Sequence, residues 1–335
     1  MILPNKLTAN SRINFVHTSS PVSKADMKDF QLTIKKMEQN YRYVRVYDVE
    51  RKELDPRYLA ASEGERLAKF RLALKKANWL MPVYGGTGCG DIIRYLRKFD
   101  LTRFRLNHPI VNGFSDTTFL LNYLYFKIKL LTFHYANGCG LFSQSNHKQF
   151  FDIISGKVTK YSYKRPAYEW LSPNKGPKKV IEGIAIGGNL TTFRDLLDIT
   201  RIVPSSWENY VLFIEDIDLD MEDLHRLLIA LDHRGIFMYC KAVVIGRMNE
   251  KSFNSSWSKL NNMFGPKKQV DHLFEYLISD VIEERMDEKD KDPLYILKVD
   301  NFGHGVFNDH MILPIGGKVR LHPDGTVEFV GPFVK

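Results

Sequence analysis

The sequence predicts an α/β protein with two domains. The first domain has a mainly parallel sheet covered by helices, and the second is a smaller domain of mixed β/α structure. Three observations support this. The chain has 335 residues, more than a single hydrophobic core usually serves. Strand-like and helix-like segments alternate over roughly the first 150 residues, as parallel sheets require. Beyond that point the rhythm changes, and the chain ends in a hairpin pattern.

Periodicity distinguishes the elements of the N-terminal part. Residues 24–40 repeat apolar side chains at helical spacing, whereas YRYVRVYD (41–48) alternates with the period of two that is typical of a strand. The glycine-rich GGTGCG (85–90) and the turn GFSDTT (113–118) each stand between an apolar strand-like stretch and a helical one. We expect strands at 13–18, 41–48, 79–84, 108–112 and 129–134, and helices at 24–40, 64–78, 91–99 and 116–128.

A basic, aromatic stretch separates the two expected domains. Residues 157–179 carry seven bases against one acid, Glu169. We interpret this stretch as a solvated linker. The alternative is a lid on which Tyr168 or Trp170 stacks against a ligand. The expected organisation is therefore an N-terminal domain over 1–155, a linker over 156–179 and a C-terminal domain over 180–335.

The C-terminal part opens with VIEGIAIGGNL (180–190) and contains one well-marked helix, which ends near Gly235. Its final hairpin is expected to turn at Asp324-Gly325. We expect strands at 211–218, 236–248 and 294–302, helices at 221–235 and 270–286, a loop at 249–269 and the hairpin at 318–331.

Composition bounds the class of protein. It is 44% hydrophobic and 26% charged, as in globular proteins, and no apolar run reaches the roughly 18 residues that span a bilayer. The start of the chain has no apolar stretch resembling a secretory signal, and the three cysteines form no CxxC pair, which fits a reducing cytoplasm. The net charge of +9 admits an anionic partner. Because acids are interspersed among the bases, we expect neither a nucleic-acid nor a membrane partner.

GFSDTT admits two interpretations of Ser115. A serine ahead of an apolar helical run is typical of a helix N-cap. The same serine could be a nucleophile on a tight strand-to-helix turn, where Gly113 avoids crowding. In that case the backbone N–H of Asp116 would point into the same space as the serine oxygen, near the positive end of the helix.

The glycine turn GGTGCG is compatible with three roles. Asp91-Ile92 follow the last glycine where a phosphate-binding loop needs Lys-Ser or Lys-Thr, and the dinucleotide pattern is also absent. A nucleotide site is therefore the weakest of the three interpretations. The others are a tight packing turn and an oxyanion hole, the latter only if a nucleophile lies nearby.

A serine nucleophile needs a base and an acid that orients it. Glu215 follows the apolar strand VLFI, and His304 lies between two glycines after another strand. Each could equally be an ordinary strand-end or packed side chain. His310, six residues after His304, is a competing base.

Taken in order, these segments resemble the LD-carboxypeptidase family of serine peptidases, which includes microcin C7 self-immunity peptidases. The resemblance covers nearly the whole chain. It implies an N-terminal Rossmann-like or flavodoxin-like domain with a mainly parallel sheet, and a smaller C-terminal mixed β/α domain. The motifs that carry it are HTSSPV, YLAASEGERLAKF, YGGTG, GFSDTT, LTFH, GGNL, LFIED, FGH and LPIG.

The resemblance implies a Ser-Glu-His triad. Its members would be Ser115 as nucleophile, Glu215 as the orienting acid and His304 as general base, because LPIG follows FGH at the family's position. The oxyanion hole would come from the N–H groups of Gly86 and Asp116.

Two departures from the family pattern lie near the expected substrate cleft. Tyr84 stands where many members have arginine, and Tyr135-Ala136 where many have Gly-Pro. The possible substrate-binding residues are Tyr84, Gly85 and Trp170.

The implied protein is a cytoplasmic homodimeric hydrolase that needs no metal or organic cofactor. The leading substrate is a murein tetrapeptide, from which D-alanine is released. The alternative is a microcin-like peptidyl or aminoacyl nucleotide, cut at its amide. A second class also stays open, a non-catalytic module that binds an anionic ligand.

Overall fold

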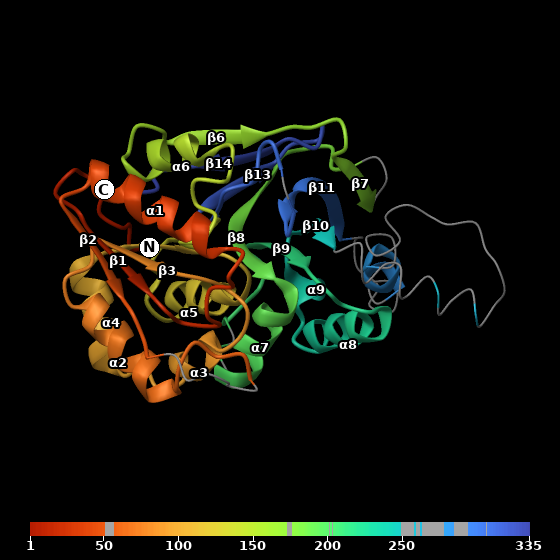
Figure 1. Cartoon of the computed structure of the whole chain (residues 1–335). Coiled ribbons are helices and arrows are strands. Elements are labelled where there is room, and N and C mark those ends of the chain that lie inside the picture. The colour runs from red at the N-terminus through yellow and green to blue at the C-terminus, as the bar shows by residue number, and fades with distance from the viewer. Residues whose placement is uncertain are drawn as a thin grey trace.

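The computed structural model describes residues 1–50, 57–172, 176–200, 202, 204–248, 258, 262, 278–284, 294–305 and 307–335. Two sheets form its framework (Figure 1). Within the described ranges, no helix is long and apolar enough to cross a membrane.

The first sheet carries the expected parallel core. Its order is β12-β5-β4-β3-β1-β2, and β1 to β5 run parallel. The order 2-1-3-4-5 of the parallel strands is that of flavodoxin-like sheets, which confirms the predicted N-terminal architecture. Ligands bind such sheets at the carboxyl ends of the strands, where the order reverses. The parallel strands are β1 (Arg12–Val16), β2 (Tyr43–Tyr47), β3 (Trp79–Pro82), β4 (Ile110–Gly113) and β5 (Thr132–His134).

Helices cover both faces of this sheet. Figure 1 shows α1 above it and α2, α4 and α5 below it. Sequence explains their bounds: α1 buries Phe30 and Met37 on one face, and α2 starts at Ser62, whose side chain accepts a hydrogen bond from the N–H of Glu65. The helices are α1 (Met27–Asn40), α2 (Glu63–Leu74), α3 (Cys89–Ile93), α4 (Lys98–Asn107), η1 (Ser115–Thr117), α5 (Thr118–Ile128) and α6 (His147–Ile154).

The second sheet is mixed, as predicted. Its order is β6-β14-β13-β8-β9-β10-β11-β7, in which β8 to β11 run parallel and the other pairings are antiparallel. In the described part of the chain it has eight strands, against six in the first sheet. Its elements are β6 (Lys160–Tyr163), β7 (Glu169–Ser172), β8 (Ile181–Asn189), α7 (Leu190–Thr200), β9 (Tyr210–Asp216), α8 (Met221–Asp232), α9 (Ile236–Tyr239), β10 (Ala242–Met248), β11 (Tyr295–Gly303), β13 (Lys318–Leu321) and β14 (Val327–Val330).

The C-terminal part of the chain returns to the first sheet. Strand β12 (Leu313–Ile315) pairs antiparallel with β5, with Leu313 opposite His134. At the chain ends, the N–H of Lys6 donates to the carbonyl of Lys335 at 3.0 Å, and the N–H of Lys335 donates to that of Pro4 at 2.9 Å. The loop after β11 therefore leads from one sheet to the other.

Residues 156–179, expected as a linker, contribute two strands. β6 and β7 lie at opposite edges of the second sheet. Tyr168 and Trp170 are each only 8% exposed; the Tyr168 hydroxyl donates to Asn301 Oδ1, and the Trp170 indole N–H donates to the carbonyl of Pro323. Alternating side chains such as Tyr161 and Tyr163 pack into the core. The lysines around them made this strand pattern hard to recognise in the sequence.

Other differences are local. Residues 236–239 form α9 rather than the start of a strand, and β10 begins only at Ala242. The expected helix over 91–99 is divided between α3 and α4. Of the expected loop at 249–269 and helix at 270–286, most residues lie outside the described ranges, and residues 278–284 are helical.

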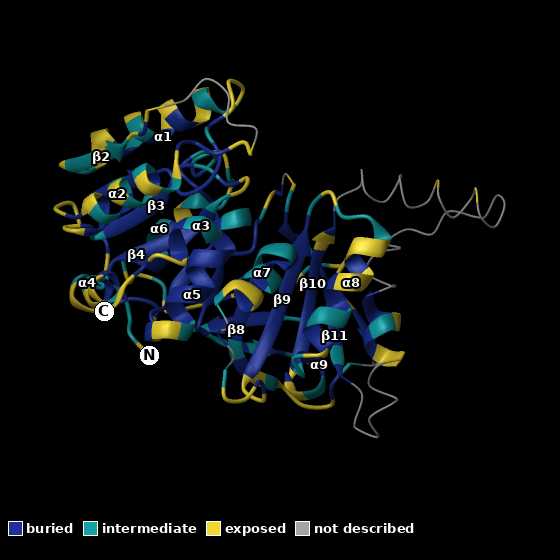
Figure 2. Cartoon of the chain, turned by 90° about the horizontal axis from the view of Figure 1, so that it is seen from below, coloured by how far each residue is buried: buried dark blue, intermediate teal, exposed yellow. Residues whose placement is uncertain are grey.

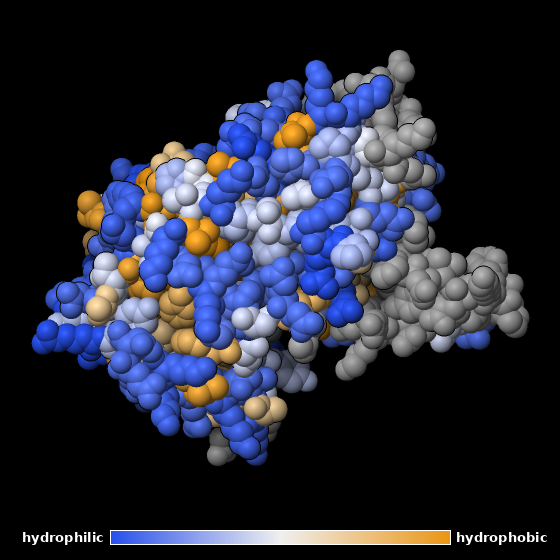
Figure 3. Space-filling model, turned by 90° about the horizontal axis from the view of Figure 1, so that it is seen from above, coloured by the Kyte–Doolittle hydropathy of each residue, from blue (hydrophilic) through white to orange (hydrophobic). Residues whose placement is uncertain are grey.

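Burial follows the layers. Figure 2 shows β8, β9 and β10 buried, whereas the outer faces of α2 and α8 carry exposed residues. On the face seen from above in Figure 3, hydrophilic side chains predominate and apolar ones are scattered.

Gly187 illustrates how closely the two halves meet. Its backbone has φ +109°, and a Cβ there would lie 2.0 Å from the carbonyl oxygen of Phe213. The Asn122 side chain from α5 donates to the Gly187 carbonyl at 2.8 Å and accepts from its N–H at 3.0 Å. A glycine is therefore required where β8 passes β9, at the point where Asn122 ties β8 to α5.

We predict that Gly187→Ala lowers the free energy of unfolding by about 3 kcal/mol or more, since it adds both backbone strain and a clash. Gly64→Ala is the matched control, because Gly64 lies in α2 with nothing within 4 Å of the added Cβ. The control should be neutral or stabilising by about 0.5–1 kcal/mol. Urea denaturation measures both, and equal stabilities would contradict the role given to Gly187.

Candidate active site

The turn after β4 holds Ser115 in a strained conformation. Ser115 has φ +61°, which is uncommon for a residue other than glycine. Gly113 makes the turn possible, because a Cβ at that position would lie 2.3 Å from the Thr117 methyl group. Ser115 thus opens η1, and α5 follows directly. This is the strand–turn–helix context of a nucleophile elbow.

Asn137 clamps this turn from the loop after β5. Its Oδ1 accepts from the N–H of Phe114 at 2.9 Å and from the hydroxyl of Thr117 at 3.1 Å. Its Nδ2 donates to the Phe114 carbonyl at 3.2 Å. The strain at Ser115 is therefore opposed by hydrogen bonds on both sides.

The glycine turn lies beside the serine. A Cβ on Gly85 would come within 3.2 Å of the Ser115 Cβ. Gly86 has φ +94°, and a Cβ there would lie 2.2 Å from Ser20 Oγ, which accepts a hydrogen bond from the N–H of Thr87. The turn after β1, the glycine turn and the serine turn thus meet at the carboxyl ends of parallel strands.

Two backbone amides at this meeting point are unused. Within the described residues, neither the N–H of Gly86 nor that of Asp116 has a hydrogen-bond acceptor. Free N–H groups beside a serine are what an oxyanion hole requires.

A fully buried arginine fixes the glycine turn from behind. Arg66 of α2 donates to the carbonyls of Thr18, Ala61 and Gly88. It also pairs with Asp91 at 2.9 Å. One planar side chain thus ties together the turn after β1, the segment before α2 and the end of the glycine turn.

The Asp116 carboxylate is hydrogen-bonded to the start of α3. It accepts a hydrogen bond from the N–H of Cys89 at 2.8 Å and another from the side chain of Ser19. Burial raises the pKa of Asp116 to about 6, although both hydrogen bonds and Arg66 oppose the shift. This carboxylate links the serine turn to α3.

Glu215 and His304 form a close pair at the ends of β9 and β11. His304 Nδ1 lies 2.7 Å from Glu215 Oε2, and the His304 backbone N–H also donates to that oxygen at 3.2 Å. Glu215 is fully buried, and the His304 side chain is 18% exposed. Burial lowers the pKa of His304, but the charge and hydrogen bond of Glu215 outweigh it, so the pKa lies above its usual value. Gly303 permits this contact, since a Cβ there would lie 2.9 Å from Glu215.

The neighbour of Ser115 brings the pair and the serine turn together. The ring of Phe114 lies 4.6 Å from that of His304, between centroids. His310 also contacts Phe114, at 5.5 Å, but burial lowers its pKa to about 3. A buried histidine of that pKa is a poor proton acceptor at neutral pH, which favours His304.

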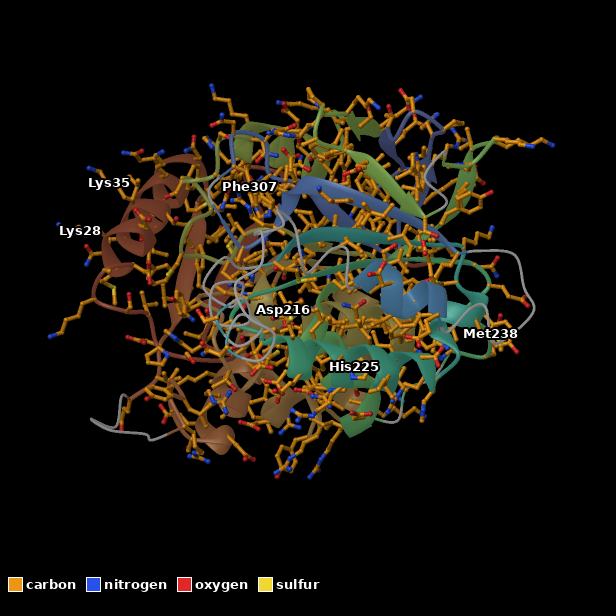
Figure 4. The ribbon with its side chains drawn as sticks, turned by 90° about the vertical axis from the view of Figure 1, so that its right-hand side faces the viewer. Lys28, Lys35, Asp216, His225, Met238 and Phe307 are labelled. Carbon is orange, nitrogen blue, oxygen red and sulfur yellow. The ribbon has the colours of Figure 1, made fainter. Side chains whose placement is uncertain are left out.

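Asp216, labelled in Figure 4, belongs to a separate network. Its carboxylate accepts from the side chain of Asn189 and from both the N–H and hydroxyl of Thr191. Among the described residues no group of three or more His, Cys, Asp or Glu is arranged to hold a metal ion.

The three expected substrate-binding residues do not lie in one place. Tyr84 and Gly85 belong to the glycine turn, and burial together with the neighbouring Asp26 raises the pKa of Tyr84. Trp170 instead packs against Tyr295 in the second sheet, with ring centroids 6.1 Å apart. Its indole N–H is already bonded, so packing accounts for its position.

Sequence comparison places this chain in a family. The N-terminal domain model of the LD-carboxypeptidases matches residues 13–135, and the C-terminal domain model matches residues 182–321. The chain belongs to the LD-carboxypeptidase family. Its members include carboxypeptidases and microcin-immunity hydrolases, so the chain is a hydrolase of this group.

Individual relatives agree. A Treponema pallidum protein described as a carboxypeptidase is 27% identical over 286 residues, covering 79% of this chain and 76% of its own length. The microcin C7 self-immunity protein MccF of Escherichia coli is 27% identical over 195 residues, covering 50% of this chain and 55% of MccF.

Solved structures share the fold. Wild-type MccF without ligand superimposes with a TM-score of 0.77 at 18% identity and full coverage of both chains. Muramoyltetrapeptide carboxypeptidase of Oxalobacter formigenes gives 0.69 at 21% identity, covering 97% of this chain and 100% of that protein.

We predict that Asp116→Asn changes the pH dependence of stability. A carboxyl whose folded-state pKa is raised contributes stability below its unfolded pKa and loses it as pH rises through the folded value of about 6. The asparagine has no such titration. Relative to the wild type, the variant should therefore gain about 2 kcal/mol between pH 4 and pH 7.5. Urea denaturation at the two pH values measures this, and parallel pH profiles would contradict it.

Proposed function

We propose that this protein is a serine-type amide hydrolase in which Ser115, His304 and Glu215 act as nucleophile, general base and orienting acid. The observation that carries the proposal is the Glu215–His304 hydrogen bond beside a serine turn with positive φ. The two unused amides of Gly86 and Asp116 supply the remaining part of the machinery.

The reaction follows from these positions. Because Nδ1 of His304 donates to Glu215, Nε2 is the nitrogen left to take the proton from Ser115 as its oxygen attacks the carbonyl. The Gly86 and Asp116 N–H groups stabilise the developing oxyanion, each by about 3 kcal/mol. His304 then protonates the leaving amine, and later removes a proton from the water that hydrolyses the acyl-enzyme. Glu215 stabilises the imidazolium throughout.

Our leading substrate is a murein tetrapeptide, cleaved to release its terminal D-alanine. Family membership and the fold shared with muramoyltetrapeptide carboxypeptidase support this choice. The alternative is an aminoacyl nucleotide, supported by the likeness to MccF, which has been solved with glutamyl sulfamoyl guanosine. We further propose that the protein acts in the cytoplasm as a homodimer.

A basic groove supports a second class of function, binding of an anionic ligand without catalysis. The groove has a volume of about 560 Å³ and lies along β2, between β1 and the end of α2. The groove follows β2 from Tyr43 to Tyr47 at the edge of the first sheet, whereas Ser115 follows β4, so β1 and β3 separate the two sites. Its described lining includes five bases and no acid: Arg12, Arg42, Arg45, Lys75 and Lys76.

Mass analysis of the products distinguishes these functions. The protein is incubated with a murein tetrapeptide and, separately, with an aminoacyl-sulfamoyl adenylate. Loss of D-alanine supports the first, and cleavage of the adenylate supports the second. Salt-sensitive binding of a polyanion without hydrolysis of either substrate supports the binding module.

We predict that Ser115→Ala abolishes turnover while leaving the fold intact, because it removes the nucleophile alone. Ser143→Ala is the matched control, since Ser143 is exposed and lies outside the site. Substrate hydrolysis and circular dichroism measure the two properties. Full activity in the Ser115 variant would refute the assignment.

The pH dependence of kcat/KM should report His304. A general base must be neutral, so activity should fall as pH drops through a pKa above the usual histidine value. Glu215→Gln removes the negative partner, which should lower the pKa of His304 and move the acid limb to lower pH. It should also reduce kcat by about a thousandfold or more. An unchanged acid limb in a folded variant would argue against the pair.

A further inference from the structure

One oxygen of the buried Glu215 has no hydrogen-bond donor. Oε2 receives both the ring and backbone N–H groups of His304. Within the described residues, Oε1 has no hydrogen-bond partner, although the side chain is 0% exposed. An ionised carboxylate is costly to bury unless both oxygens are satisfied, so a donor for Oε1 is expected nearby.

His134 of β5 faces this oxygen. Its Nε2 lies 4.0 Å from Oε1 and its side chain is 0% exposed. In the part of the chain that the structure describes, neither ring nitrogen has a hydrogen-bond partner. Burial, and then the charges of His310 and His304, hold the pKa of His134 well below its usual value. The ring is therefore neutral and carries a single N–H to give.

The surroundings of His134 fix its orientation. The ring lies between Phe114 and Phe302, with centroid distances of 5.0 and 5.3 Å. On the β8 side, Gly188 provides room, because a Cβ there would lie 2.8 Å from the imidazole. Along the strand, His134 pairs with Leu313 of β12. The ring is thus held by both halves of the chain.

We propose that His134 is a positioning residue that already directs its Nε2–H at Glu215 Oε1 in the free protein, 4.0 Å away, and donates a full hydrogen bond to it when substrate occupies the site. The present separation is too long for a hydrogen bond, but catalytic hydrogen bonds often tighten only when substrate binds. The donation keeps Oε2 directed at His304. The inference rests on the proposed function and adds a fourth participant from the N-terminal domain.

Loss of the His134 donor should raise the pH at which His304 titrates. The active form of the pair is a carboxylate with a neutral imidazole. Without a donor at Oε1, the carboxylate charge is less compensated and attracts the His304 imidazolium more strongly, so His304 holds its proton to higher pH. The other groups that face the pair are His310, which is neutral, and Asp216 and Asp218 on the His304 side.

Substitutions of matched shape separate this role from packing. His134→Gln can place its amide N–H near the original Nε2, whereas His134→Asn is too short to reach Oε1 and His134→Phe has no donor. His310→Phe is the control, because His310 is also buried against Phe114 but has no hydrogen bond or ion pair with Glu215 among the described residues.

The first experiment follows the titration of His304 in substrate-free protein by NMR of labelled histidine, and the His304→Gln variant assigns its signal. The second measures kcat and KM as a function of pH. We expect His134→Phe and His134→Asn to move the midpoint and the acid limb upward by about one pH unit. At pH 7 they should lower kcat about tenfold with KM unchanged. His134→Gln should restore most of the loss, and His310→Phe should leave the midpoint in place.

An unchanged His304 midpoint in folded His134→Asn or His134→Phe would overturn the proposal, as would equal behaviour of the glutamine and asparagine variants. If His134→Phe does not fold, the glutamine–asparagine comparison decides. Failure to hydrolyse either substrate would refute the proposed function alone, because the NMR titration needs no turnover.

Discussion

The hydrogen bond between Glu215 and His304 is the interaction on which the site depends. Glu215 ends a fully buried strand of the second sheet, and His304 begins the loop that crosses to β12 of the first sheet. The imidazole is therefore held by one sheet while its loop is anchored in the other. Any shift between the sheets would change the distance between His304 and the serine turn.

The serine turn adds a second constraint. Ser115 adopts a conformation that its side chain disfavours, and hydrogen bonds from Asn137 and Asp116 hold the turn in place. Such strain persists only where the surroundings impose it, and it leaves the serine oxygen and the following amide accessible together. The flavodoxin-like strand order makes β3 and β4 neighbours, so the serine turn lies next to the glycine turn.

Much of this could be predicted from the sequence, because its signals are local. Strand–helix alternation predicted the parallel sheet, and the glycines around residues 85, 113 and 303 marked turns where chains approach closely. Ordered motifs then suggested Ser115, Glu215 and His304, whose catalytic roles stay predictions. The structure adds that Glu215 and His304 are hydrogen-bonded and that Phe114 joins them to the serine turn.

What the sequence could not supply depends on long-range contacts. The lysines of residues 157–179 suggested a solvated linker, yet strand pairing with β14 and β11 decides the position of β6 and β7. Arg66 looks like a surface residue of an amphipathic helix, and only the carbonyls that converge on it explain its burial. His134 lies within the LTFH motif, but nothing local in the sequence indicated that it would face a carboxylate of the second sheet.

The central claim is that His304, held by Glu215, activates Ser115. Intact-mass analysis after treatment with a fluorophosphonate, followed by peptide mapping, tests it most directly. We expect a single adduct on Ser115, which should be absent in Ser115→Ala and should form far more slowly in His304→Ala. An adduct on another residue, or labelling of Ser115 at the same rate without His304, would contradict it.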